Sequence, residues 1–184
     1  MRIRSSIATL FAGAAVSLAL AVGIESGLKP GEMVTPFHPK HVSGPDAGTD
    51  TCPPCKYGAR PAVQVWVNGD SDENVSKLTA SLSKAVDAHK DKELKAFVVM
   101  LTMCQGCEAK AKSVGEKTEH KNIGIAYLPN NDAAVKNYKI NVSSEVKNTV
   151  MVYKNKRVAA TFVNLKADKE GLEKLHAAIA GVTE

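Results

Sequence analysis

The pattern of apolar and polar positions divides residues 62–184 into alternating strands and helices. Short apolar, β-branched runs between turn residues are typical of strands, and apolar residues repeating every three or four positions are typical of packed helices. The strands are expected at 62–67, 97–102, 123–128, 149–153 and 158–163. The helices are expected from a cap at Asp70 or Ser71 to about 89–91, over 108–120 and 132–138, and from a cap at Asp168 onwards.

The order of these elements predicts an α/β fold. Strands that alternate with helices favour a mostly parallel central sheet with right-handed crossovers and flanking helices. The last two strands are separated only by the polar turn at 154–157 and are expected to form an antiparallel hairpin. A chain of 184 residues is long enough for one such domain with terminal extensions.

The first 61 residues do not share this pattern. Arg2 and Arg4 precede an apolar run that contains the small-residue motif Ala-Leu-Ala at 19–21, which predicts a signal peptide over 1–23. The protein is therefore expected to be exported to the periplasm or the outside of the cell, with an uncleaved membrane anchor as the alternative. Residues 24–61 are rich in Gly, Pro, His and Asp and predict an irregular N-terminal arm.

Charge and hydropathy narrow the classes of partner. The formal charge is +5, and it falls to +3 without Arg2 and Arg4. The lysines alternate with acidic residues along the expected helices, which indicates solvated faces rather than a nucleic-acid footprint. Beyond the signal segment, no run is long and apolar enough to suggest contact with a membrane.

The chain has four cysteines, arranged as two Cys-x-x-Cys pairs, Cys52/Cys55 and Cys104/Cys107. In an exported protein these residues are disulfide-competent, and pairing within each motif is favoured over the other two pairings that are possible.

Cys104 and Cys107 are the first candidate for a redox dithiol. They stand between the expected strand at 97–102 and the expected helix at 108–120. A helix N-terminus favours thiolate over thiol, so Cys104 would be the nucleophile and Cys107 the resolving thiol. A structural disulfide is the alternative interpretation.

Cys52 and Cys55 are the second candidate. Gly58 and Pro61 follow them closely and interrupt any long helix, so this pair is expected on a loop before the first strand. A structural disulfide that stabilises the loop of the arm is as consistent with this position as a catalytic role.

The order of elements, with a Cys-x-x-Cys after the second strand and a closing hairpin and helix, resembles the thioredoxin-like superfamily over residues 60–184. The resemblance implies a thioredoxin-like domain over 62–184, with Cys104 and Cys107 at the position of the family's dithiol.

The segment at 138–155 (YKI followed by NTVMVYKN) is similar to the family segment whose cis-proline faces the disulfide, but Asn148 replaces the proline. A second alignment is also open, because residues 27–37 are similar to the N-terminal segment of the redoxin branch. In that alignment the strand at 61–67 leads to the active site. The loop at 68–74 then takes the active-site position and contains no cysteine.

The resemblance implies thiol–disulfide exchange with protein thiols or disulfides as partners and no soluble cofactor. The sequence does not decide whether the protein is an enzyme. If it is one, the resemblance implies a thiol–disulfide oxidoreductase.

Two further functions are considered. One is a non-catalytic binding module whose His38 and His41, together with Cys52 and Cys55, form a zinc or copper(I) ligand set; two solvated histidines are the simpler interpretation. The other is a peroxidase, because Pro45, Thr49 and Cys52 have the spacing of the peroxiredoxin motif. That motif needs a preceding strand and a following helix, and neither is expected here.

Overall fold

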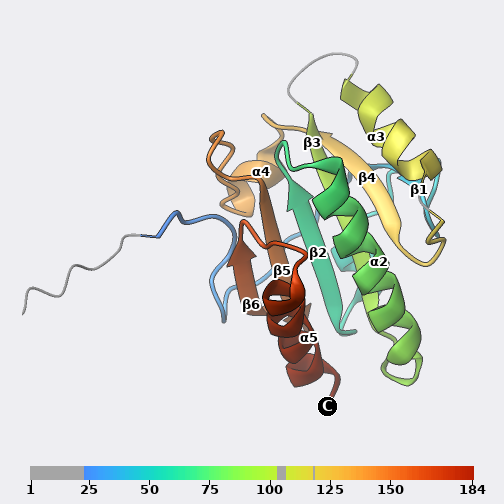
Figure 1. Cartoon of the computed structure of the whole chain (residues 1–184), viewed down its shortest axis with the longest axis vertical. Helices are drawn as coiled ribbons and strands as arrows, with labels where there is room; N and C mark the ends of the chain where they lie inside the picture. Colours follow the sequence, from blue (N-terminus) through green and yellow to red (C-terminus); the bar gives the residue numbers. More distant parts are fainter. Residues whose placement is uncertain (1–22, 103–106, 118) are drawn as a thin grey trace, which may run out of the picture.

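The computed structural model describes residues 23–102, 107–117 and 119–184, and the predicted signal peptide lies almost entirely outside them. Its strands form one six-stranded sheet in the order β1-β4-β3-β2-β5-β6 (Figure 1). The strands are β1 (Lys40–Ser43), β2 (Ala62–Val67), β3 (Lys95–Thr102), β4 (Gly124–Pro129), β5 (Asn148–Lys154) and β6 (Arg157–Val163). The helices are α1 (Pro53–Tyr57), α2 (Asp72–Ala88), α3 (Cys107–Lys117), α4 (Ala133–Asn137) and α5 (Lys169–Thr183), with a 3-10 turn at Lys90–Lys92.

The centre of the sheet is parallel and its margins are antiparallel. β2 pairs in parallel with β3, and β3 with β4. β5 pairs antiparallel with β2 and with β6, and β1 pairs antiparallel with β4. The α/β class, the mostly parallel centre and the closing hairpin predicted from the sequence are therefore confirmed.

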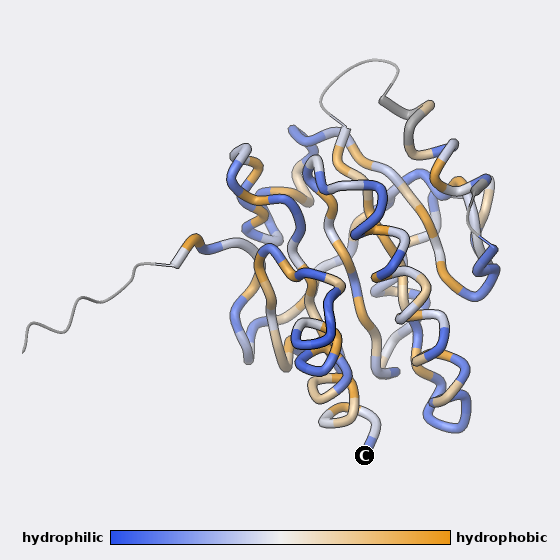
Figure 2. Tube along the Cα trace, viewed as in Figure 1, coloured by the Kyte–Doolittle hydropathy of each residue, from blue (hydrophilic) through white to orange (hydrophobic). Residues whose placement is uncertain are grey.

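A hydrophobic core lies on each face of the sheet. On one face, Leu78 of α2, Ala111 of α3 and Leu175 of α5 belong to one buried cluster. Figure 1 shows α2 and α5 crossing this face, and Figure 2 shows the apolar positions concentrated along the central strands. Burying each large apolar side chain contributes about 1.5–3 kcal/mol to stability. Because strand residues alternate between the two clusters, a shift of one residue would move every side chain to the other face, and the register is therefore fixed.

The N-terminal arm and α4 cover the opposite face. Phe37 of the arm packs against Trp66 of β2 and Tyr138 at the end of α4, with ring centroids 5.1 and 5.2 Å apart. Leu28 and Val34 of the arm are buried in the same cluster. The arm is thus part of the core of this face.

The strands and helices expected between residues 62 and 184 are all present, with ends displaced by a few residues. Two helix caps were also predicted correctly: the Ser71 hydroxyl accepts the Asn74 N–H at 3.2 Å, and Asp168 Oδ1 accepts the Gly171 N–H at 2.9 Å.

Two elements of the arm were not predicted. β1 buries the polar residues His41 and Ser43, so its sequence lacks the apolar alternation that identifies a strand. The expectation of a loop around Cys52 and Cys55 was wrong, because α1 begins directly after Cys52. Proline is tolerated in the first turn of a helix, which allows this five-residue helix to begin with two prolines.

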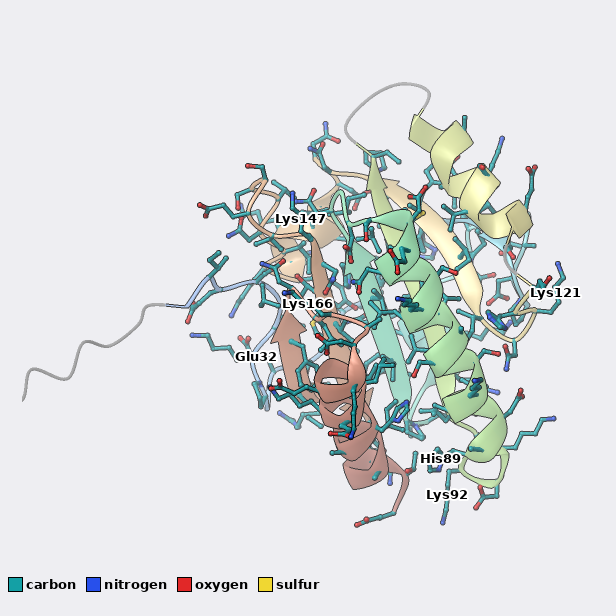
Figure 3. The ribbon with its side chains drawn as sticks, viewed as in Figure 1. Glu32, His89, Lys92, Lys121, Lys147 and Lys166 are labelled. Atoms are coloured by element: carbon teal, nitrogen blue, oxygen red, sulfur yellow. A yellow bond between two sulfur atoms is a disulfide. The ribbon has the colours of Figure 1, made fainter. Side chains whose placement is uncertain are left out.

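Many lysine side chains lie on the outside of the molecule. Lys92, Lys121 and Lys147 point away from the ribbon at three separate places (Figure 3). In the part of the chain that is described, no helix combines the length and apolar character required to cross a bilayer.

Candidate functional site

Cys52 and Cys55 form a disulfide, with their Cα atoms 5.3 Å apart. Pairing within this motif is thereby confirmed. The two cysteines differ in exposure: Cys52 is 5% exposed, whereas Cys55 belongs to the exposed surface together with Lys56. The Cys55 N–H donates a hydrogen bond to Cys52 Sγ at 3.2 Å.

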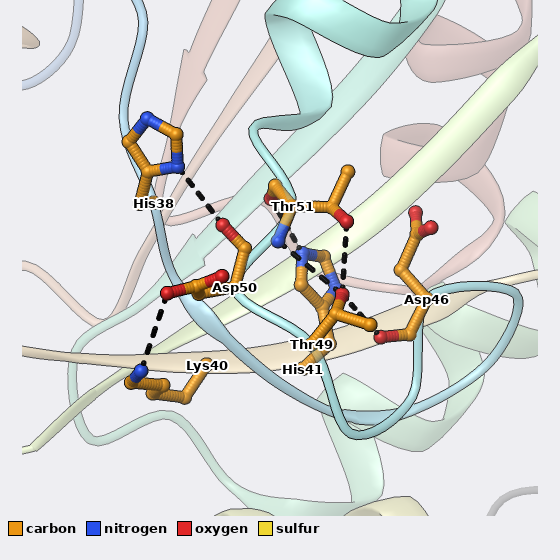
Figure 4. Close-up of polar contacts among 7 residues, drawn as sticks. All are labelled: His38, Lys40, His41, Asp46, Thr49, Asp50 and Thr51. Atoms are coloured by element: carbon orange, nitrogen blue, oxygen red, sulfur yellow. Dashed lines mark hydrogen bonds and ion pairs between the residues drawn. The ribbon is translucent and has the colours of Figure 1, made fainter.

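Two histidines order the backbone just before Cys52. His41 Nε2 donates to the carbonyl oxygen of Thr51 at 3.0 Å, and His38 Nδ1 donates to that of Asp50 at 2.9 Å (Figure 4). Thr51, the residue directly before Cys52, is thereby hydrogen-bonded to β1.

The loop at 44–51 is also tied to α1. The Asp46 carboxylate, which is buried, forms an ion pair with Lys56 of the helix. The Thr49 hydroxyl donates to the Asp46 carbonyl oxygen at 2.8 Å (Figure 4). The disulfide therefore lies in a segment whose backbone is held on both sides, with one sulfur-bearing residue covered and the other accessible.

The candidate metal ligands are not assembled in this state. His38 and His41 each use one ring nitrogen for a backbone carbonyl, and the sulfurs of Cys52 and Cys55 are bonded to one another. Among the residues that the structure describes, no group of three or more His, Cys, Asp or Glu side chains is arranged to hold a metal ion.

The peroxiredoxin-like spacing also has a structural setting that was not expected. β1 precedes Cys52 and α1 follows it, so a strand and a helix do flank the motif. However, the strand is at the edge of the sheet, and the Thr49 hydroxyl bonds to Asp46 and Thr51 within the loop.

A second group of polar residues lies where β2 and β5 meet. Asn148, the first residue of β5, is 1% exposed and faces Val67, the last residue of β2. Its Nδ2 donates to Asp70 Oδ2 at 2.6 Å and to the Leu165 carbonyl at 3.0 Å, and its Oδ1 accepts the Leu165 N–H at 2.9 Å. The amide of this side chain is thus hydrogen-bonded through both its nitrogen and its oxygen.

Asn74 of α2 extends this group. Its Nδ2 donates to Asp70 Oδ2 at 2.7 Å, and its Oδ1 accepts the Ala167 N–H at 2.7 Å. The loop at 68–74 is therefore joined to the segment after β6. From the sequence, Asp70 was predicted only as a helix cap, because no local pattern indicates that residues so far apart meet.

The helices α1 and α3 pack on different faces of the sheet. α1 packs through Tyr57, whose ring lies 5.8 Å from that of Phe97, in the cluster under the arm. α3, which begins at Cys107, packs through Ala111 in the cluster on the other face. The sheet therefore separates the Cys52–Cys55 disulfide from the body of α3.

Neither a protein-family model nor a curated protein sequence matches the chain. Solved structures do match it over most of its length. A Chlorobium tepidum protein assigned as the thiol:disulfide interchange protein DsbE has a TM-score of 0.65 and 11% identity, covering 85% of this chain and 99% of that one. The thioredoxin domain of a thiol-disulfide oxidoreductase from Bacteroides vulgatus has a TM-score of 0.57 and 13% identity, over 83% and 99%. Xanthomonas campestris peroxiredoxin Q has a TM-score of 0.56 and 12% identity, over 86% and 99%.

The chain has a thioredoxin-like fold. At identities of 11–13%, the likeness to these structures shows the fold alone.

Within the thioredoxin-like fold, strand pairing favours the second of the two alignments. Asn148, which the sequence resemblance aligns with the family's cis-proline, lies against Val67 and Asp70. The position that would face it is therefore the loop at 68–74, which contains no cysteine. In this alignment the motif of Cys104 and Cys107 follows the neighbouring strand, β3.

The first-choice catalytic pair stays a prediction. Cys107 is the first residue of α3, as expected for a Cys-x-x-Cys that begins a helix. Cys104 lies outside the described residues.

Proposed function

We propose that this thioredoxin-like protein carries out thiol–disulfide exchange with protein partners, and that Cys52 and Cys55 form a redox-active pair. The observation that carries the proposal is the disulfide itself, in a Cys-x-x-Cys motif with an exposed second cysteine. The Chlorobium and Bacteroides proteins of the same fold are named as a thiol:disulfide interchange protein and a thiol-disulfide oxidoreductase, which supports the same reaction class here.

The reaction needs no soluble cofactor. A partner dithiol reduces the disulfide through a mixed disulfide and leaves as a disulfide itself, while Cys52 and Cys55 take up its two electrons and two protons. In the opposite direction the reduced pair would reduce a partner disulfide. Cys104 and Cys107 are retained as a second proposed dithiol.

An insulin disulfide-reduction assay tests this proposal with two matched double variants, Cys52→Ser/Cys55→Ser and Cys104→Ser/Cys107→Ser. Because exchange requires both thiols of a pair, we expect the first variant to lose activity by about tenfold or more and the second to lose less. An active Cys52→Ser/Cys55→Ser variant overturns the assignment to this pair. A wild-type protein that neither reduces insulin nor oxidises a reduced test protein overturns the exchange function.

A structural disulfide in a non-catalytic binding module is the second candidate. It is favoured by the burial of Cys52 and by the ties from His41 and Asp46 to the adjacent backbone. In that case reduction with dithiothreitol lowers the thermal stability markedly, while the insulin assay shows no activity. An exchange centre gives activity with little loss of stability on reduction.

We also propose that the protein acts after export. Arg2, Arg4 and the following apolar run support this, and disulfide chemistry suits an oxidising compartment. Cell fractionation combined with the mass of the mature protein tests it. A cytoplasmic, full-length protein would contradict it.

A further inference from the structure

We propose that the two cysteines of this motif have inverted roles: the partner thiolate attacks Cys55, and Cys52 is the buried resolving thiol. This inference rests on the proposed exchange function. It differs from the assignment made for Cys104 and Cys107, in which the first cysteine of the motif is the nucleophile.

Accessibility distinguishes the two cysteines. A thiolate approaches a disulfide sulfur from the side opposite the leaving sulfur, so the attacked residue must be open to solvent, and access is one of the factors that set the rate. Cys55 is exposed and is followed by the exposed Lys56. Cys52 is 5% exposed and is followed by the buried Pro53 and Pro54.

The ties of the preceding loop maintain this difference. His41 holds the Thr51 carbonyl, and Asp46 holds Lys56 of α1. The backbone before Cys52 is thereby attached to β1, and the Lys56 side chain of α1 is attached to the loop at 44–51. To expose Cys52 Sγ, these contacts would have to break, whereas Cys55 needs no rearrangement.

The same geometry suits Cys52 as the leaving and resolving sulfur. The partner thiolate forms a bond to Cys55 Sγ, the Cys55–Cys52 bond breaks, and its electron pair leaves on Cys52 Sγ. The Cys55 N–H, which already donates to Cys52 Sγ at 3.2 Å, is placed to stabilise this charge. A second thiolate of the partner then attacks its own sulfur in the mixed disulfide, forms the partner disulfide and releases Cys55 as a thiolate, and the two cysteine thiolates take up two protons.

The reverse direction uses the same roles. The Cys55 thiolate attacks a partner disulfide, and Cys52 attacks Cys55 Sγ to release the reduced partner and restore the Cys52–Cys55 bond. Partners are therefore expected to be trapped on the second cysteine of the motif.

Mapping of the first adduct tests the inference on the intact disulfide. The oxidised Cys104→Ser/Cys107→Ser protein is mixed briefly with reduced glutathione, quenched in acid and digested with trypsin. Fragmentation between Cys52 and Pro53 of the peptide 41–56 separates the two sites by mass. Because access controls which sulfur is attacked, we expect glutathione on Cys55 to exceed that on Cys52 by about tenfold.

Single-cysteine variants give a second measurement in the same Cys104→Ser/Cys107→Ser background. Cys52→Ser leaves Cys55 and is expected to react about tenfold faster with the thiol reagent DTNB than Cys55→Ser, because access to the thiol limits the reaction. In urea, where both thiols are exposed, the two rates should converge.

The outcomes separate this inference from the function on which it rests. Glutathione mainly on Cys52, or equally on both residues, overturns the inverted roles even if the insulin assay shows activity. Glutathione on Cys55 in a protein that is inert toward insulin and toward reduced proteins overturns the exchange function alone. A disulfide that forms no adduct while an exposed control disulfide reacts overturns both.

Discussion

Asn148 is a buried polar residue whose side chain links two segments that lie far apart in the sequence. Its amide bonds to Asp70 and to both backbone groups of Leu165. Each donor and acceptor of the amide is directed at a partner within the protein. The arrangement therefore joins the β2–α2 loop to the segment after β6.

Replacing Asn148 with alanine should destabilise the protein. The substitution removes the hydrogen-bond partner of the buried Leu165 N–H and carbonyl, and it removes a donor from Asp70. The free energy of unfolding should therefore fall by about 2–4 kcal/mol. Urea unfolding measures it, with the exposed Asn131→Ala as a control expected within about 0.5 kcal/mol of wild type. A stable Asn148→Ala variant would show that the network contributes little.

Among the elements, the loop between β1 and α1 depends on the conformation of its glycines. Gly44 and Gly48 both have positive φ, +85° and +81°, a region that favours glycine. A Cβ at Gly44 would lie 2.2 Å from the Ile123 carbonyl oxygen, whereas a Cβ at Gly48 would meet no atom within 4 Å. Of these two glycines, therefore, only Gly44 lies so close to the backbone at the start of β4 that a side chain is excluded.

This contrast gives a matched pair of substitutions. Gly44→Ala and Gly48→Ala share the backbone cost of positive φ, about 1 kcal/mol, and only Gly44→Ala adds a clash with backbone, about 1–3 kcal/mol more. Thermal denaturation measures the difference in stability. Equal stabilities for the two variants would contradict the tight contact at Ile123.

The elements between 62 and 184 were predictable because their apolar residues recur with the period of a strand or a helix. β1 was not, because His41 and Ser43 are buried as polar residues with contacts that only the folded chain supplies. The candidate site was predictable only as a list of cysteines. The burial of Cys52, the exposure of Cys55 and the meeting of Asp70 with Asn148 depend on contacts between segments far apart in the sequence.

At the scale of the whole molecule, the N-terminal arm and the sheet form one aromatic core. Phe37 lies against Trp66 and Tyr138, and the Tyr138 hydroxyl donates to the Thr35 carbonyl at 2.6 Å. The phenols of Tyr57, Tyr138 and Tyr153 are all buried in this core. Stability and the ionisation of these phenols are consequently coupled.

Burial raises the pKa of all three phenols above the usual value of 10.0, with the charge of Asp46 adding to the effect at Tyr57. The folded protein therefore keeps these protons at a pH at which the unfolded chain releases them. Their contribution to stability is complete below about pH 10 and is lost as the pH rises toward the folded-state pKa values. Each phenol lowers the free energy of unfolding by about 1.4 kcal/mol per pH unit in that range.

Tyr153→Phe isolates this effect. Among the described residues, the Tyr153 hydroxyl has no hydrogen-bond partner, so its removal should leave the stability at pH 7 unchanged or slightly higher. Above about pH 10 the variant should lose stability less steeply than wild type, because one proton fewer is released on unfolding. Urea unfolding at intervals from pH 8 to about pH 11.5, above the usual tyrosine pKa, measures both slopes. Identical slopes for the two proteins would show that Tyr153 ionises in the folded state as readily as in the unfolded chain, contrary to its burial between the arm and the sheet.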